Sequence, residues 1–208
     1  MKNQVAAGLN MGIAGIPWWT TDIGGFFGAN INDPEFHELL VRWFEYGCFC
    51  PVMRLHGYRW PLQPQYGTTG GATCVSGAPN EVWSYTDQVC EILSDYLRLR
   101  ERMLPYITEL MEEAHEKGTP VMRPLFYDFP EDKESWNVET EYMFGPKVLV
   151  KPITDADARE TDVYLPGGAS WTNAWTGETF EGGQKVHVAA PIEQIPLFTR
   201  DGYKLPMK

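Results

Sequence analysis

Two short apolar runs, Gly15–Trp19 and Cys50–Leu55, are the only convincing strands in the first 120 residues of the chain. Both runs lack polar alternation, and the pattern between them predicts a helix. This order is typical of parallel strands that are covered by helices. Two strands and one intervening helix cannot cover both faces of such a sheet. The first part is therefore predicted to be the end of a larger α/β domain.

Hydrophobic periodicity predicts the helices of this first part. A short helix is expected over 2–13, and a second begins at Asp33-Pro34, where Asp suits the N-cap and Pro the first helical position. The apolar face of the second helix comprises Phe36, Leu39, Leu40, Trp43 and Phe44. A long helix over 87–117 should kink at Pro105, which lacks the N–H of a helical hydrogen bond, and should end at Gly118.

The character of the sequence changes near residue 120, where short apolar runs separated by turn residues begin. These runs are Val121–Phe126, Tyr142–Phe144, Val148–Ile153, Asp162–Leu165, Trp171–Trp175, Val186–Val188 and Ile192–Phe198. Runs of this length with Gly-rich turns predict an antiparallel β-sandwich. We therefore expect an α/β part over residues 1–120 and an all-β domain over 121–208.

The net charge, the apolar runs and the cysteine spacing argue against nucleic acid, a membrane span and a zinc site. The formal net charge of −11 disfavours nucleic acid, and no apolar run is long enough to span a membrane. The N-terminal stretch is broken by glycine and asparagine and has one basic residue, so it does not predict a signal peptide. The four cysteines, Cys48, Cys50, Cys74 and Cys90, match no zinc signature and are expected to be small buried thiols. We expect no metal and no cofactor.

Asp22 is the first candidate functional residue. It follows the first predicted strand and lies among Trp18, Trp19 and Phe26, just before the Gly24-Gly25 pair. Aromatic faces suit the C–H faces of sugars, and a carboxylate accepts hydrogen bonds from sugar hydroxyls. The segment therefore predicts one wall of a carbohydrate pocket. A simple turn aspartate beside glycine is an equally good interpretation of Asp22.

Arg54 and His56 follow the second predicted strand and should lie at the same rim as Asp22. An arginine there could pair with Asp22, and a histidine could bind sugar hydroxyls or act as a base. Structural roles for both side chains are the alternative. A long loop is expected from Gly57 to Asn80, as at many functional sites. The other histidines, His37, His115 and His187, are predicted to be surface residues.

Five motifs together resemble glycoside hydrolase family 31, which includes α-glucosidases and α-xylosidases. They are Gly-Ile-Pro-Trp-Trp-Thr-Thr-Asp-Ile-Gly-Gly-Phe at 15–26, Arg-Leu-His-Gly at 54–57, Arg-Leu-Arg-Glu-Arg-Met-Leu-Pro-Tyr at 98–106, Gly-Thr-Pro-Val-Met-Arg-Pro-Leu at 118–125 and Ile-Pro-Leu-Phe-Thr-Arg-Asp-Gly at 195–202. The resemblance implies the C-terminal end of a (β/α)8 barrel with its last two strands, followed by an antiparallel β-sandwich domain.

The resemblance also implies a retaining mechanism on α-linked sugars, with one aspartate as nucleophile and another as acid/base. The family's two segments that carry these carboxylates do not occur here and would lie upstream of Met1. Asp22, Phe26, Arg54 and His56 match family residues that hold the sugar, so none of them is expected to be catalytic. The implied partners are an α-linked oligosaccharide and the missing N-terminal part of the same enzyme.

Several alternatives stay open at this point. The chain could be part of a glycosidase that is inactive alone, or a non-catalytic sugar-binding or truncated module. A dyad of Asp22 with Glu81 or Asp87 is a third, less favoured interpretation. The Trp18-Trp19 pair and the segment 65–70 resemble bacterial α-xylosidase-type members more than α-glucosidases, which would place a parent enzyme in the cytoplasm or periplasm. Open apolar edges predict self-association.

Overall fold

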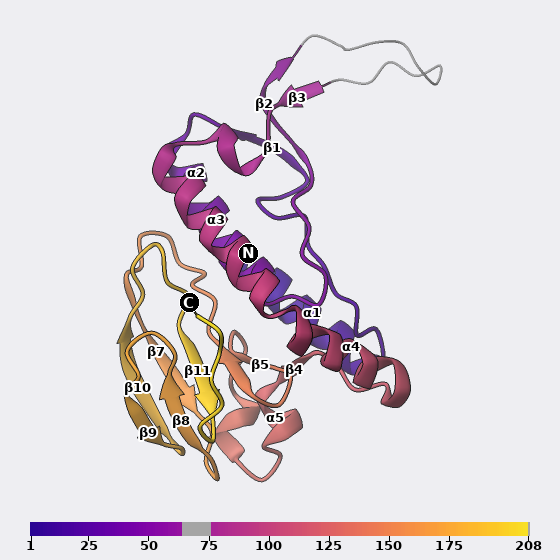
Figure 1. Ribbon diagram of the computed structural model, residues 1–208, viewed down its shortest axis with the longest axis vertical. Coiled ribbons are helices and arrows are strands. Elements are labelled where there is room, and N and C mark those ends of the chain that lie inside the picture. The colour runs from indigo at the N-terminus through magenta and orange to yellow at the C-terminus, as the bar shows by residue number, and fades with distance from the viewer. Residues whose placement is uncertain (64–75, 208) are drawn as a thin grey trace.

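The computed structural model describes residues 1–63 and 76–207. It consists of a helical part and a β-domain, with the helices lying along one side of the sheets (Figure 1). The first part contains α1 (Lys2–Ile13), β1 (Phe27–Asn30), α2 (Pro34–Cys48), β2 (Tyr58–Gln63), β3 (Ser76–Ala78), the 3-10 turn η1 (Val82–Ser84), α3 (Asp87–Arg102) and α4 (Leu104–Lys117). No helix in the described ranges has the length and apolar character needed to cross a bilayer.

Helix α2 begins and packs as the sequence predicts. The Asp33 carboxylate accepts a hydrogen bond from the Glu35 N–H at 3.0 Å and so caps the first turn. Phe36, Leu40 and Phe44 are buried on the inward face. Leu39 is the exception, with 40% of its surface exposed.

The long predicted helix is two helices. Helix α3 is capped by Thr86, whose hydroxyl accepts from the Val89 N–H at 3.3 Å, and it ends at Arg102. Pro105 lies in the first turn of α4, so the predicted kink is a complete break at Met103. Gly118 ends α4 in the left-handed conformation, with φ of 70°.

The two strands predicted in the first part are wrong in position. Gly15–Trp19 and Cys50–Leu55 lie outside the strands, and Trp18 is 56% exposed rather than buried. The two segments still lie side by side, because the Val52 N–H donates to the Trp19 carbonyl at 3.1 Å and the Ile23 N–H donates to the Arg54 carbonyl at 3.3 Å. Two isolated bonds do not make a regular ladder.

The parallel pair forms further along the chain, between β1 and β2. Strand β2 also pairs with β3 in antiparallel orientation. Both β2 and β3 fall within the region Gly57–Asn80, so the prediction of one long loop there is wrong for these stretches. The segment 65–70 and Cys74 lie outside the described residues.

The β-domain is a sandwich of two antiparallel sheets, as predicted. The larger sheet has the strand order β4-β5-β6-β11-β8-β9, and β10 pairs with β7 in the smaller one. The elements are β4 (Met122–Pro124), α5 (Leu125–Asp128), η2 (Lys133–Trp136), β5 (Tyr142–Phe144), β6 (Val148–Val150), β7 (Glu160–Leu165), β8 (Ser170–Asn173), β9 (Thr179–Glu181), β10 (Gln184–Ala189) and β11 (Leu197–Arg200). The first run ends as the helix α5, β9 was not predicted, and only Leu197 and Phe198 of the predicted run Ile192–Phe198 lie in a strand.

Both faces of the larger sheet are buried, which explains its apolar runs without alternation. Tyr142 and Phe144 of β5 point into the core shared with the helices, whereas Met143 between them points into the core of the sandwich. The Tyr142 hydroxyl donates to the Phe49 carbonyl at 3.0 Å, after the end of α2. The same buried cluster therefore runs through both parts of the chain, and a domain boundary near residue 120 stays a prediction.

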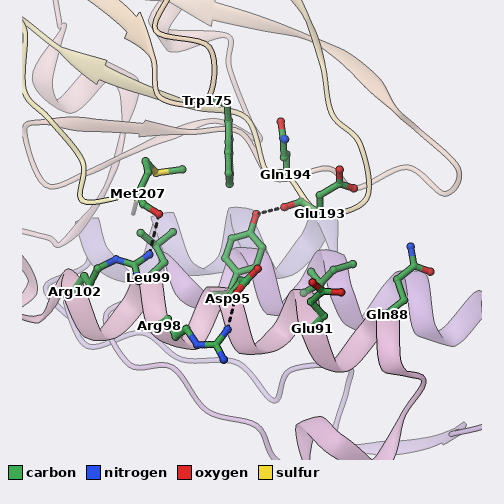
Figure 2. Close-up of a pocket in the computed structure, with 12 residues that line it drawn as sticks. Gln88, Glu91, Asp95, Arg98, Leu99, Arg102, Trp175, Glu193, Gln194 and Met207 are labelled. Carbon is green, nitrogen blue, oxygen red and sulfur yellow. Dashed lines mark hydrogen bonds and ion pairs between the residues drawn. The ribbon is translucent and has the colours of Figure 1, made fainter.

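A cleft of about 670 Å³ lies between α3 and the β-domain (Figure 2). On the sheet side, Trp175 is fixed by a hydrogen bond from its indole N–H to the Ile195 carbonyl at 2.7 Å. At the other end, Arg102 of α3 donates to the carbonyls of Pro206 and Met207 at 2.8 and 2.9 Å. At that end of the cleft, α3 is therefore tied to the C-terminal residues of the chain.

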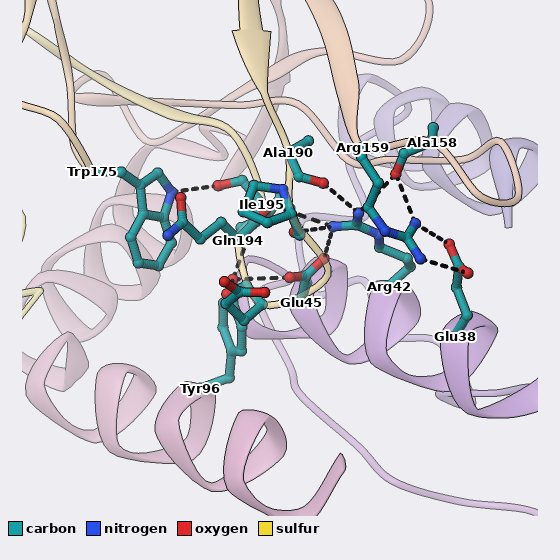
Figure 3. A network of polar contacts seen from close by, with 12 residues as sticks. Glu38, Arg42, Glu45, Tyr96, Ala158, Arg159, Trp175, Ala190, Gln194 and Ile195 are labelled. Atoms are coloured by element: carbon teal, nitrogen blue, oxygen red, sulfur yellow. Dashed lines mark hydrogen bonds and ion pairs between the residues drawn. The ribbon is translucent and has the colours of Figure 1, made fainter. Parts of the chain in front are cut away.

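A buried arginine joins α2 to the β-domain (Figure 3). Arg42 is 3% exposed, and its guanidinium pairs with Glu45 at 3.1 Å. Nη1 also donates to the carbonyls of Pro191 and Gln194, and Nη2 donates to those of Ala158 and Ala190. A guanidinium that satisfies several backbone carbonyls of another part fixes the two parts to each other.

Tyr96 and Glu45 extend this network to α3. The Tyr96 hydroxyl lies 3.1 Å from the Glu45 carboxylate and accepts from the Ile195 N–H at 3.0 Å. Burial raises the pKa of Glu45 to about 8, although Arg42 lies beside it. At the rim, Arg159 binds both oxygens of Glu38, and this hydrogen bonding lowers the pKa of Glu38.

Candidate functional site

The four predicted residues lie on two neighbouring segments that lead into β1 and β2. Asp22 and Phe26 precede or border β1, and Arg54 and His56 precede β2. These segments are adjacent because β1 and β2 pair in parallel and the Tyr58 N–H donates to the Phe26 carbonyl at 3.1 Å. The structure therefore brings the four side chains to one place, in two pairs.

The first pair is ionic. An Arg54 guanidinium N–H donates to the Asp22 carboxylate, as the sequence predicts. The side chains are 49% and 22% exposed respectively, so the pair is accessible to a ligand. A carboxylate and a guanidinium fixed side by side offer acceptors and donors together, which suits vicinal hydroxyl groups.

The second pair is aromatic. The ring centroids of Phe26 and His56 are 5.5 Å apart, with the planes tilted by 30°. Phe26 is 59% exposed. An exposed aromatic face beside a polar pair is the arrangement that suits a sugar ring, whose C–H face is apolar and whose edge is polar.

The backbone around Asp22 turns sharply. The Gly25 N–H donates to the Asp22 carbonyl at 2.7 Å, and Gly24 and Gly25 have φ of 81° and 86°. The left-handed conformation favours glycine at both positions. Asp22 therefore does occupy a turn, as the simpler interpretation of the sequence held, and the turn aims its carboxylate at Arg54.

Arg59 stabilises this turn, and no sequence motif predicts its role. Its side chain is fully buried, and it donates to the carbonyls of Gly25 at 2.7 Å and Ile23 at 2.9 Å. The guanidinium also lies over the ring of Phe36, 5.1 Å from its centroid. A Cβ on Gly24 would come within 2.8 Å of the guanidinium, so glycine is needed there for this close approach.

Two tryptophans anchor the residues before Asp22 to α2. The Trp43 indole N–H donates to the Thr21 hydroxyl at 2.6 Å, and the Trp19 indole N–H donates to the Tyr46 hydroxyl at 3.2 Å. Ile23 is 1% exposed and packs so close to Gly47 that a Cβ there would lie 2.5 Å from it. Helix α2 thus fixes the segment on both sides of Asp22.

A hollow of about 520 Å³ adjoins the aromatic pair. Its lining includes Phe26, Leu55, His56, Tyr58, Asn80 and Glu81, but neither Asp22 nor Arg54. The hollow therefore begins at the aromatic pair and extends away from the ionic pair. The larger cleft beside α3 is lined by none of the four predicted residues, so it is a separate feature.

Asn80 fixes the far wall of this hollow. Its side-chain amide donates to the Gly57 carbonyl at 3.2 Å and accepts from the Tyr85 hydroxyl at 2.5 Å. Burial raises the pKa of the Tyr85 phenol, which keeps that hydroxyl protonated as a donor. Gly57 allows the close approach, since a Cβ there would lie 2.6 Å from the carbonyl oxygens of Gly25 and Phe26.

The remaining candidates do not join this site. Burial raises the pKa of Cys48 and of Cys50 to about 12, so these two are buried, unreactive thiols as predicted. His187 is exposed in β10 and pairs with Asp162 at 2.8 Å. Among residues 1–63 and 76–207, no group of three or more His, Cys, Asp or Glu side chains is placed to hold a metal.

The arrangement is suited to holding a sugar rather than cleaving its bond. Retaining hydrolysis needs two carboxyl groups about 5–5.5 Å apart on opposite sides of the bond. Asp22 is held by Arg54, and Glu81 lies in the adjoining hollow, which does not include Asp22. Asp87 lies in the first turn of α3, where a carboxylate favours the helix N-terminus.

The chain is similar to several known proteins. It is 39% identical to an alpha-xylosidase of Saccharolobus solfataricus over 207 residues, and 35% identical to alpha-glucosidase 2 of Bacillus thermoamyloliquefaciens over 195 residues. These matches cover 100% and 93% of this chain. A solved GH31 alpha-xylosidase from a soil metagenome, complexed with xylose, is 53% identical, with a TM-score of 0.93 over 98% of this chain.

The chain spans less than a third of the length of each of these relatives. It corresponds to 26% of the first relative, 22% of the second and 30% of the solved chain. Two family models cover nearly all of it: the glycosyl hydrolases family 31 TIM-barrel domain matches residues 1–110, and the glycosyl hydrolase family 31 C-terminal domain matches residues 118–205. The chain therefore belongs to glycoside hydrolase family 31, as a part of the family's barrel domain followed by its C-terminal domain.

Proposed function

We propose that this chain forms the sugar-holding wall of a retaining α-glycosidase. The observation that carries this proposal is the joint placement of the Asp22–Arg54 ion pair and the exposed Phe26–His56 pair on two adjacent segments. One sugar ring would lie against this wall. Membership in a family of glycosidases supports the assignment.

Each residue has a distinct role in this proposal. The Asp22 carboxylate accepts hydrogen bonds from sugar hydroxyls, and Arg54 orients that carboxylate while donating to a neighbouring hydroxyl. Phe26 packs against the C–H face of the ring, and His56 binds a hydroxyl at its edge. Arg59 keeps the backbone from Ile23 to Gly25 in the shape that presents Asp22.

The two reacting carboxylates would come from outside these 208 residues. The described site offers one carboxylate that is already committed to a guanidinium, and the chain corresponds to under a third of the solved α-xylosidase. Nucleophilic and acid catalysis each contribute several powers of ten. Without them, we expect the chain alone to bind sugar but not to hydrolyse it.

We propose α-linked xylose as the sugar, with α-linked glucose as the alternative. The relative at 39% identity is an alpha-xylosidase, and the solved structure at 53% identity is an alpha-xylosidase complexed with xylose. A relative at 35% identity is an alpha-glucosidase, so the choice between the sugars needs a direct comparison.

A non-catalytic sugar-binding protein is the second candidate. One observation favours this candidate. The site has groups suited to a sugar, but Asp22 pairs with Arg54 and Glu81 lies in the separate hollow. The two candidates differ in one outcome. A glycosidase part should regain turnover when it is combined with the remaining barrel segments of a family 31 enzyme, whereas a binding module should not.

Titration calorimetry with xylose tests the proposed site. Asp22→Asn should weaken xylose binding by about tenfold, because it replaces a charged acceptor with a neutral amide. Asp87→Asn is the matched control, because it changes a carboxylate in the first turn of α3 and should leave the affinity unchanged. Equal affinities in the wild type and Asp22→Asn would contradict the proposal, and a glucose titration ranks the two sugars.

A further inference from the structure

The cleft between α3 and the β-domain is a second place where a ligand can bind. Its volume of about 670 Å³ lies within the range of about 300–1,000 Å³ found for small-molecule sites. The residues of α3 that line it extend from Gln88 to Arg102 along one face of the helix. At about 1.5 Å per residue, this face is about 21 Å long. The cleft is therefore elongated, as a site for a chain of several units would be.

Trp175 supplies a fixed aromatic surface on the other side of the cleft. Its indole N–H donates to the Ile195 carbonyl at 2.7 Å, and its backbone N–H donates to the Asn173 side-chain oxygen at 2.9 Å. Figure 2 shows the indole projecting from the β-domain toward α3. The side chain is half-buried, so part of it remains accessible from the cleft. An aromatic ring that is already held in place binds a ligand at little cost in conformational entropy.

The loop that carries Glu193 and Gln194 is held by the buried network of Figure 3. Arg42 donates to the Gln194 carbonyl at 3.3 Å, and the Tyr96 hydroxyl lies 3.1 Å from the Glu193 carbonyl. The same hydroxyl accepts from the Ile195 N–H at 3.0 Å. These contacts use the backbone of the loop, and the side chains of Glu193 and Gln194 line the cleft. The wall opposite α3 is therefore preformed.

The charges around the cleft are nearly balanced. Among the described residues, the lining has the carboxylates of Glu91, Asp95 and Glu193 and the guanidinium groups of Arg98 and Arg102. Carboxylates repel a phosphate or another anion, and guanidinium groups repel a cation. A neutral ligand avoids both effects. The mixture of acceptors and donors suits hydroxyl groups, since each hydroxyl can both accept and donate a hydrogen bond.

We propose that this cleft binds an α-linked oligosaccharide, with one ring packed against Trp175 and neighbouring rings hydrogen-bonded to Glu91 and Gln194. The site is separate from the Asp22 wall, because the two share none of their lining residues. The inference therefore goes beyond the proposed function. A second contact with the same long substrate would keep that substrate at the protein by raising its effective concentration.

Fluorine NMR of a chain labelled with 5-fluorotryptophan tests the place of binding. The chain has 8 tryptophans, and the resonance that disappears in Trp175→Phe assigns the one in the cleft. Maltohexaose, an α-linked glucose chain, should shift the Trp175 resonance. Xylose at the same concentration should leave it unmoved, because a single ring makes only a fraction of the contacts. Asp22→Asn should still show the shift with maltohexaose, since Asp22 lies outside the cleft.

Calorimetry with maltohexaose in the Asp22→Asn chain tests the individual residues. Trp175→Ala should weaken binding by about tenfold, and Glu91→Ala by roughly threefold. Glu178→Ala is the matched control, because Glu178 is an exposed carboxylate on the turn after Trp175 that does not line the cleft. Trp175 packs partly against the core, so its removal can lower stability. Glu91 is exposed, and the Glu91→Ala chain should unfold at the wild-type temperature.

Each outcome decides for or against the inference. A Trp175 resonance that maltohexaose does not move overturns it. An equal loss of affinity in Glu91→Ala and Glu178→Ala also overturns it, because the effect would then come from surface charge in general. Tighter binding of arginine amide or inorganic phosphate than of maltohexaose would show that the ligand is charged. Failure of xylose to bind the wild-type chain contradicts the proposed function alone, and a Trp175 shift with maltohexaose would still support the cleft.

Discussion

The rings of Phe26 and His56 lie 5.5 Å apart and join the two halves of the candidate site. On one side lies the Asp22–Arg54 ion pair, and on the other the hollow that contains Glu81. The two rings come from segments separated by α2, so the parallel pairing of β1 with β2 is what places them together. The aromatic contact is thus a product of the fold rather than of local sequence.

Removal of the Phe26 ring should weaken sugar binding without unfolding the chain. Phe26 is 59% exposed, so Phe26→Ala should change the free energy of unfolding by less than about 1 kcal/mol, while xylose affinity falls by about tenfold. Phe27→Ala is the control, because Phe27 is 66% exposed but does not line the hollow. Calorimetry and urea denaturation measure the two effects. An equal loss of affinity in both variants would argue against direct stacking on Phe26.

Arg59 should matter for both stability and the order of the Asp22 turn. Arg59→Met leaves the buried carbonyls of Ile23 and Gly25 without donors, and we expect a loss of about 2–4 kcal/mol in the free energy of unfolding. Hydrogen exchange should accelerate at the amides from Ile23 to Phe27. Arg98→Met, at an exposed arginine of α3, should change neither quantity. Unchanged exchange in Arg59→Met would show that the turn does not depend on this guanidinium.

The buried network predicts a specific dependence of stability on pH. The pKa of Glu45 is raised from an ordinary value of 4.5 to about 8, so between these values the folded state binds a proton that the unfolded state releases. This contribution to stability is complete below about pH 4.5 and is lost as the pH rises through about 8. The free energy of unfolding should therefore fall with rising pH in this window, by at most about 1.4 kcal/mol per pH unit.

Glu45→Gln isolates this effect, because glutamine does not titrate. Urea denaturation across the window should give a flatter pH dependence in the variant than in the wild type. The pKa of His187 is also raised by Asp162, and this stabilisation is likewise lost as the pH rises. His187 is present in both proteins, so the difference between them belongs to Glu45. Parallel pH profiles would contradict a raised pKa at this position.

The isolated chain should self-associate through its exposed apolar side chains. Phe27, Trp60 and Leu62 on β1 and β2 are 66%, 41% and 38% exposed. A combined Phe27→Ser and Trp60→Ser variant should shift size-exclusion chromatography toward the monomer. Trp136→Ser in the β-domain, where Trp136 is 57% exposed but stacked on Phe126, serves as control. A wild-type monomer with a sharp thermal transition would contradict this prediction.

The parts of the fold that local chemistry decides were predictable. The Asp33 cap and the strand at Tyr142–Phe144 follow from capping chemistry and a continuous apolar run, and proline geometry predicts an interruption at Pro105, although as a kink rather than the break observed at Met103. The positions of the strands in the first part, in contrast, were not predictable from local sequence. Trp18 and its neighbours are apolar enough for a buried strand, yet in this structure their segment makes only isolated bonds with the segment around Val52.

The residues of the candidate site also differ in how far the sequence predicts them. Asp22, Phe26, Arg54 and His56 stand in recognisable motifs, so their placement could be predicted. Arg59 could not, because its role depends on carbonyls from a segment 34 to 36 positions away.

Hydrolysis of an aryl α-xyloside by the purified, folded chain alone is the measurement that tests the central claim most directly. The account predicts xylose binding at the Asp22 site but no turnover above the uncatalysed rate, because the chain holds the sugar without supplying the two reacting carboxylates. Robust turnover that is abolished by Asp22→Asn would contradict it, since Asp22 would then be a catalytic carboxylate rather than part of the sugar-holding wall.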